Sequence, residues 1–142
     1  MSTSIGWFIH CLRHYAQFSG RASRPEYWWF YAVVTGVNLL WIMLSHTLLS
    51  WTGVILSLIW NLAVVIPHVA VASRRLHDTG HSFWWMVPPM IVGFVVLAMG
   101  RAVPGLLLVV LIGLAAAFVW LLCEPGDHGP NRYGDPAPTA PN

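Results

Sequence analysis

The sequence predicts an all-α integral membrane protein, a four-helix bundle preceded by an amphipathic interfacial helix. Of its 142 residues, 57% are hydrophobic and only 8% are charged, whereas about a quarter of the residues in a soluble domain are charged. Asp, Glu, Lys and Arg are absent from residues 27–73, 79–100 and 102–123. A helix crosses the hydrocarbon core with about 20 apolar residues. The first stretch therefore fits two crossings, and each of the others fits one.

The first element is an amphipathic helix within residues 1–18. Its apolar side chains recur at helical spacing and its polar ones lie on the opposite face. The helix is too short and too polar to cross a bilayer, so we expect it to lie in the headgroup region with Trp7 and Phe8 turned toward lipid. The alternative is a helix that packs on the bundle.

Four spans follow within residues 19–123, at about 27–45, 53–72, 83–99 and 105–123. Pro25 suits the first turn of the first helix. Tight outer turns are expected around residues 46–52 and 100–104, with Trp51 at the outer interface.

Two local features of the later spans carry further predictions. Pro88 and Pro89 predict a kink in the third span. Gly113 and the three alanines at 115–117 would let a neighbouring helix approach the fourth span closely.

Arginine positions predict the orientation, because basic residues are retained on the cytoplasmic side. The assigned spans place six of the seven arginines on the side of both termini and Arg101 alone on the other. We therefore expect a multi-pass protein with cytoplasmic N- and C-termini. Residues 124–142, rich in Pro and Gly, form a cytoplasmic tail whose last seven residues we expect to be disordered.

Three polar segments, residues 20–26, 73–82 and 124–135, meet at the cytoplasmic face in this topology. The middle one is the densest, and Thr79-Gly80 favours a loop over a continuing helix. Its arginines, with those of the first segment, are suited to an anionic phosphate, which a guanidinium binds with two hydrogen bonds. The alternative is that they set the topology and pair with Glu26, Asp78 or Asp135.

These segments contain three motifs, FSGRASRPEYW at 18–28, RRLHDTGHSFWW at 74–85 and GPNRYG at 129–134. In order and spacing they resemble domain-of-unknown-function family 805 of bacterial inner-membrane proteins, over residues 1 to about 136. The resemblance implies a small helical domain in the inner membrane and supplies no reaction.

The candidate binding site is a polar cytoplasmic cap that we expect to hold an anionic lipid headgroup or a partner protein. The expected partners are membrane lipids, another membrane protein or further copies of the chain. The alternative function is a component of an oligomeric transporter for a small solute or ion. The cap comprises Arg21, Arg24, Glu26, Arg74, Arg75, His77, Asp78, Asn131, Arg132 and Tyr133.

Other chemistry has weaker support. His77 and His81 have a metal-like spacing but no evident third ligand, so no metal or other cofactor is predicted. A nucleophile with an activating base is not apparent, which argues against an enzyme. A net charge of +2 gives no nucleic-acid signal.

Polar residues inside the spans have two interpretations each. His46 and His68 suit either a proton relay or ordinary hydrogen-bonded interfacial positions. Asn38 and Asn61 suit either a solute path or a bridge between helices.

Overall fold

The computed structural model describes residues 3–47, 51–99, 102 and 104–140, and every regular element within them is helical. The all-α prediction is confirmed. The outer turns include residues 48–50, 100, 101 and 103, which lie outside the described residues, as do the side chains of His46 and Trp51. The elements are α1 (Thr3–Arg13), α2 (Arg24–Thr47), α3 (Trp51–Asp78), the 3-10 helix η1 (Phe83–Met86), α4 (Val87–Met99) and α5 (Gly105–Cys123).

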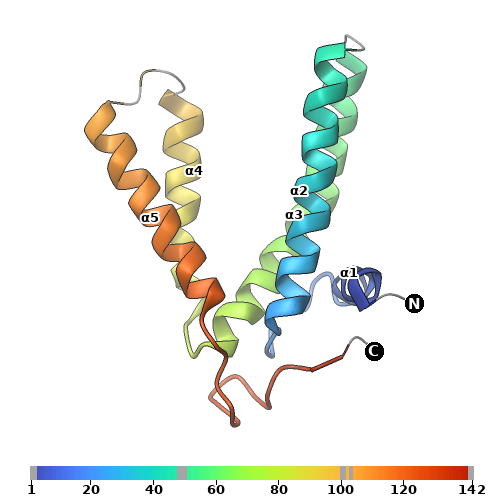
Figure 1. Ribbon diagram of the computed structural model, residues 1–142, viewed down its shortest axis with the longest axis vertical. Coiled ribbons are helices and arrows are strands. Elements are labelled where there is room, and N and C mark those ends of the chain that lie inside the picture. Colours follow the sequence, from blue (N-terminus) through green and yellow to red (C-terminus); the bar gives the residue numbers. More distant parts are fainter. Residues whose placement is uncertain (1–2, 48–50, 100–101, 103, 141–142) are drawn as a thin grey trace.

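The α2–α3 hairpin and the α4–α5 hairpin diverge from a shared end of the molecule (Figure 1). We call this end the base and define it as residues 3–30, 64–86 and 118–140. Contacts between the hairpins are made where the end of α3 meets η1 and α5. A four-helix bundle is therefore not confirmed, because the hairpins share a base and no core along their length.

The small residues of α5 do not bring another helix close. Gly113 and residues 115–117 are exposed, and a Cβ atom added at Gly113 would meet no atom within 4 Å. Small residues permit close packing but do not by themselves attract a neighbour, and no described helix uses the space at Gly113.

Three of the described helices are long and apolar enough to cross a membrane: residues 24–44, 53–78 and 105–123. Residues 83–99 form a shorter apolar helix. Within the most apolar 18 residues of each of these three helices, only 17%, 22% and 17% are buried inside the protein. Lipid or another chain must cover the rest of this surface.

Proline positions explain two details of helix geometry. Pro88 and Pro89 lie in the first turn of α4, directly after η1, and so begin a helix where we expected a kink inside one. Proline is tolerated there because the first-turn amides have no partner within the helix. Pro67 instead lies inside α3, and α3 changes direction toward the base (Figure 1).

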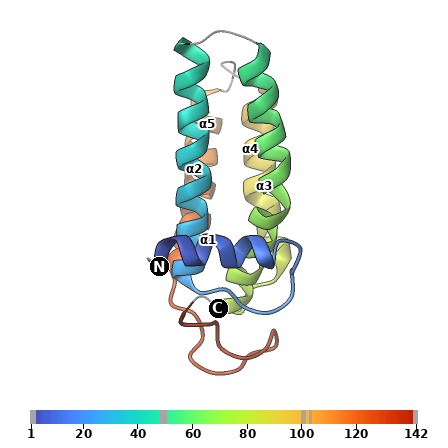
Figure 2. The same cartoon turned by 90° about the vertical axis from the view of Figure 1, so that its right-hand side faces the viewer.

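α1 lies across the lower ends of α2 and α3 (Figure 2). Trp7 and Cys11 are each only 1% exposed, and Ile5 and Leu12 face outward. The prediction that Trp7 turns toward lipid is wrong, because its ring packs inside the protein. α1 thus resembles the packed-helix alternative, and a placement at the membrane interface is not confirmed.

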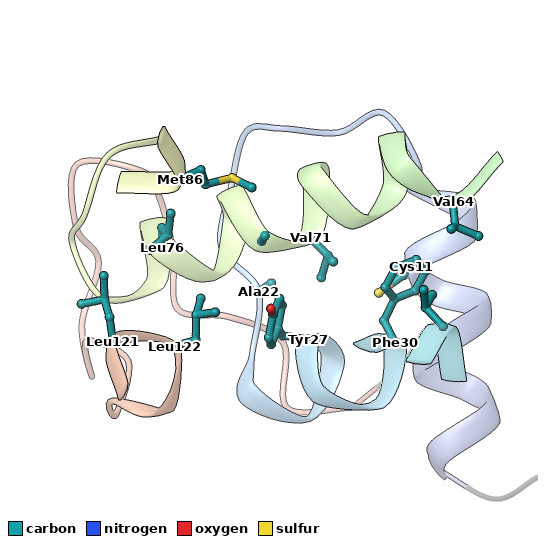
Figure 3. Close-up of a cluster of buried hydrophobic side chains, with 12 residues drawn as sticks. Cys11, Ala22, Tyr27, Phe30, Val64, Val71, Leu76, Met86, Leu121 and Leu122 are labelled. Atoms are coloured by element: carbon teal, nitrogen blue, oxygen red, sulfur yellow. The ribbon is translucent and has the colours of Figure 1, made fainter. Parts of the chain in front are cut away.

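Most of the buried apolar side chains gather at the base (Figure 3). Tyr27 and Phe30 of α2 face Val71 and Leu76 of α3, and Leu122 of α5 joins the same cluster. This cluster fixes the ends of three helices around the polar segments.

Candidate functional site

The central polar motif lies on a helix, because α3 continues through Asp78 where we expected a loop from residue 73. Residues 71–78 are all buried. Neighbouring positions on a helix point about 100° apart, so Arg74 and Arg75 reach different sides of α3. Arg74 meets α2, and Arg75 meets the end of α5.

Arg74 forms a buried ion pair with Glu26. Its Nη1 donates to Glu26 Oε1 at 2.6 Å, and the two side chains are 4% and 0% exposed. His10 Nε2 lies 3.9 Å from the same oxygen, and the Cys11 thiol lies 3.8 Å from it. The pair therefore ties α2 to α3 beneath α1.

Asp78 bridges two arginines, and we call Arg21, Arg75 and Asp78 the triad. Arg21 Nε donates to Asp78 Oδ1 at 2.8 Å, and Arg75 Nη1 donates to Oδ2 at 2.5 Å. All three residues are at most 5% exposed. A carboxylate with one guanidinium on each oxygen has its charge compensated inside the protein.

The triad also binds the chain that follows α5. Arg75 Nε donates to the Leu122 carbonyl at 3.0 Å, and its Nη2 donates to the Glu124 carbonyl. Arg21 Nη1 donates to the Gly129 carbonyl at 2.6 Å, and its Nη2 donates to the Asp127 carbonyl. These carbonyls belong to the end of an α-helix and to an irregular segment, where backbone acceptors lack partners of their own.

The closing motif packs on the other side of the α3 terminus. The rings of His77 and Tyr133 stack with centroids 3.9 Å apart and an angle of 6° between their planes. His77 Nδ1 hydrogen-bonds the Gly20 carbonyl at 3.1 Å, and Asn131 Nδ2 donates to the His77 carbonyl at 2.9 Å. Arg132 lies over the Tyr133 ring at 4.8 Å. His77 thus contacts both the opening and the closing motif.

The three sequence motifs therefore meet in one place. Of the ten cap residues, eight are engaged in contacts within the base and are buried or half-buried. Arg24 and Arg132 are exposed. Arg21, Arg74 and Arg75, three of the four arginines expected to hold an anion, are thus already paired with Glu26 or Asp78, and Asp135 has no ion pair among the residues described.

Arg24 is the exposed cation of the opening motif. Its Nε donates to the Glu124 carbonyl at 3.0 Å. Its two terminal nitrogens have no hydrogen-bond partner in the described part of the chain. Arg24 and Pro25 line a shallow groove with Trp28 and Trp29, whose floor is apolar.

The two histidines of the central motif have different partners. His77 stacks on Tyr133, whereas His81 Nδ1 lies 3.1 Å from the Thr79 hydroxyl and its ring meets the Trp85 edge. Among the described residues, no three His, Cys, Asp or Glu side chains are placed to hold a metal ion.

Polar residues inside the α2–α3 hairpin contact each other or aromatic rings. Asn61 Nδ2 donates to Asn38 Oδ1 at 3.4 Å and to the Ser57 carbonyl at 2.8 Å, as the bridging interpretation expects. His68 lies among the rings of Tyr27, Phe30 and Tyr31.

The sequence analysis did not identify Gly126 and Asp127, which follow α5 and lie against Asp78 of the triad. A Cβ atom added at Gly126 would lie 1.9 Å from Asp78 Oδ2, so only glycine fits beside the carboxylate. The Asp127 amide donates to the Asp78 carbonyl at 2.9 Å. The available signal was Pro125-Gly126 directly after an apolar run, which marks a turn but not its partner.

Comparisons with known proteins agree with the membrane assignment. The inner membrane protein YhaH of Escherichia coli K12 is 32% identical over 135 residues, covering 92% of this chain and 94% of that protein. The inner membrane protein YhaI of the same strain is 33% identical over 129 residues, covering 91% and 92%. The uncharacterized protein YiiR is 31% identical over 131 residues, covering 82% and 83%. No solved structure matches this chain.

A family described as proteins of unknown function, DUF805, matches residues 15–135 and so includes all three motifs. Together with apolar helices of spanning length and the inner membrane relatives, this match identifies a bacterial inner membrane protein. The chain belongs to the DUF805 family.

Proposed function

We propose that the chain crosses the inner membrane four times with both termini in the cytoplasm, and that its base binds an anionic lipid headgroup at Arg24. The base then contains six of the seven arginines, as the retention of basic residues on the cytoplasmic side requires. Residues 83–99 form the shortest span, about 28 Å long from the rises of a 3-10 turn and an α-helix. A bilayer adapts to a short span by local thinning.

Cysteine labelling tests this orientation. Cys123 is exposed at the base end of α5, whereas Cys11 is buried. Burial, and then the nearby Glu26 carboxylate, raise the pKa of the Cys11 thiol to about 12, so at neutral pH it lacks the reactive thiolate. We expect a membrane-impermeant maleimide to label Cys123 in inside-out vesicles and not in spheroplasts.

The Cys123→Ser variant is the control, and it should remain unlabelled in both preparations until the protein is denatured. Labelling of Cys123 in intact spheroplasts would reverse the proposed orientation.

The headgroup proposal depends on one observation about Arg24. Its two terminal guanidinium nitrogens have no hydrogen-bond partner among the described residues, and its side chain lines the groove with Trp28 and Trp29. A guanidinium binds a phosphate through two parallel hydrogen bonds, and Arg24 Nη1 and Nη2 are both open to receive one. Trp28 and Trp29 line the same groove about one helical turn further along α2. Tryptophan rings favour the boundary between headgroups and acyl chains. Cationic sites of this kind on the cytoplasmic side suit anionic headgroups.

Lipid retention tests the headgroup proposal. We expect the purified chain to bind phosphatidylglycerol in preference to phosphatidylcholine with the same acyl chains, as measured by native mass spectrometry. Arg24→Gln should reduce phosphatidylglycerol binding about fivefold, because one arginine near an anionic surface contributes about 1 kcal/mol.

Arg13→Gln is the matched control, since it removes an equally exposed cation at the end of α1. Equal retention by the wild type and Arg24→Gln would exclude this headgroup site. If one protein co-purifies in stoichiometric amount with the wild type and is lost from Arg24→Gln, the cap binds a partner protein and not a lipid headgroup.

The transporter alternative has less support. A groove lined by Asn38, Ser57 and Asn61 lies between α2 and α3, but Asn61 donates hydrogen bonds to the Asn38 side chain and to the Ser57 carbonyl. Such bonds serve to join helices in a membrane.

A further inference from the structure

A second groove lies on the other hairpin, between η1, the start of α4 and α5, with a volume of about 350 Å³. It exists because the chain at residues 83–86 forms a 3-10 turn and α4 begins only at Val87. Opposite these elements, α5 presents the small side chain of Ala117. Prolines on one wall and an alanine on the other leave space that larger side chains would fill.

The groove has a polar part and an apolar body. His81 and Glu124 are the polar residues of the lining, and Trp85, Pro88, Phe118 and Trp120 are among its apolar residues. Trp85 and Trp120 are 51% and 66% exposed, so the body of the groove is open along the side of the hairpin. In a bilayer this side faces lipid acyl chains.

Glu124 is a carboxylate without a cation. Its backbone carbonyl accepts hydrogen bonds from Arg24 and Arg75, but its side chain has no hydrogen bond or ion pair within the described residues. His81 uses Nδ1 toward the Thr79 hydroxyl, which leaves Nε2 for another partner. An unpaired carboxylate above an apolar groove complements a cation that carries hydrogen-bond donors and an apolar tail.

We propose that this groove binds a lipid with a primary amine in its headgroup, the ammonium group donating to the Glu124 carboxylate and an acyl chain lying along Trp85 and Phe118. This site differs from the Arg24 groove in position and in charge preference. It does not depend on the proposed headgroup function at Arg24.

The test distinguishes the effect of the N–H donors of the headgroup from the effect of its positive charge. The full chain in detergent is offered equal amounts of phosphatidylethanolamine and phosphatidylcholine with identical acyl chains, and bound lipid is counted by native mass spectrometry. Both headgroups carry one positive charge, but only ethanolamine has N–H donors. We expect about a tenfold excess of bound phosphatidylethanolamine, the contribution of one hydrogen bond to a charged group.

Three variants locate the effect. Glu124→Gln should bring the ratio near unity while the backbone contacts of residue 124 keep the fold. Ala117→Trp should fill the groove and lower the binding of both lipids. Arg13→Gln should leave the ethanolamine-to-choline ratio unchanged, because Arg13 is an exposed cation that lines neither groove.

Three results would overturn the proposal. The first is a wild-type ratio of unity, and the second is a ratio that Glu124→Gln does not change. A dimer mass that Ala117→Trp abolishes, in place of bound lipid, would assign the groove to a second copy of the chain and would also count against it. Free ethanolamine should not compete, because it lacks the tail that the apolar body receives.

Discussion

Replacing Asp78 with alanine is expected to lower the free energy of unfolding by about 3–5 kcal/mol, the usual effect of removing one partner from a buried ion pair. The change leaves the guanidiniums of Arg21 and Arg75 inside the base without their carboxylate. Both arginines also hold the segment after α5. Loss of Asp78 therefore weakens the junction between α3 and the C-terminal residues as well as the triad itself.

Unfolding in mixed micelles, followed by the loss of helical circular dichroism, measures this effect. Asp135→Ala is the control, because Asp135 is exposed and lies in the same C-terminal segment. We expect it to change stability by less than about 0.5 kcal/mol, as for other surface substitutions. Similar values for the two variants would mean that the triad does not stabilise the base.

Gly126→Ala is also expected to lower the free energy of unfolding. The added methyl carbon would lie 1.9 Å from Asp78 Oδ2 and 2.5 Å from its Cγ. The carboxylate cannot move aside, because both of its oxygens are held by arginines. We expect a loss of stability of about 1–3 kcal/mol, typical of an overpacked site.

Gly129→Ala provides the comparison, since a methyl group at Gly129 meets no atom within 4 Å. In the double variant with Asp78→Ala, the Gly126→Ala penalty should largely disappear because the clashing carboxylate is gone. Additive losses in the double variant would show that the clash is not the cause.

The sequence predicted the helices well because a chain of this size cannot bury such long uncharged stretches in a core of its own, and in lipid they must be helical. The predicted second span ends at about residue 72, whereas α3 continues to Asp78. Arg74, Arg75 and Asp78 remain helical because partners from α2, α5 and the tail compensate their charges, and no local pattern contains that information. Thr79-Gly80 does end the helix, and Gly80 has a positive φ of 73°.

The pairing of the cap residues was predictable only in part. Glu26 and Asp78 were obvious partners for the arginines, because few acids occur nearby in the sequence. Which arginine meets which acid depends on the rotation of α3 against α2, and that rotation is set by the apolar cluster around Phe30 and Val71. Carbonyl acceptors such as that of Leu122 carry no sequence signal, because every residue has one.

The close contact between the triad and residues 124–129 has a consequence for biosynthesis. The ribosome delivers the α2–α3 hairpin first, with the Arg74 and Glu26 pair complete inside it. The carbonyls that receive Arg21 and Arg75 emerge only after α5 has been made. The nascent protein therefore inserts its first hairpin with two guanidiniums still incompletely bonded, and the last part of the chain to be translated completes their coordination.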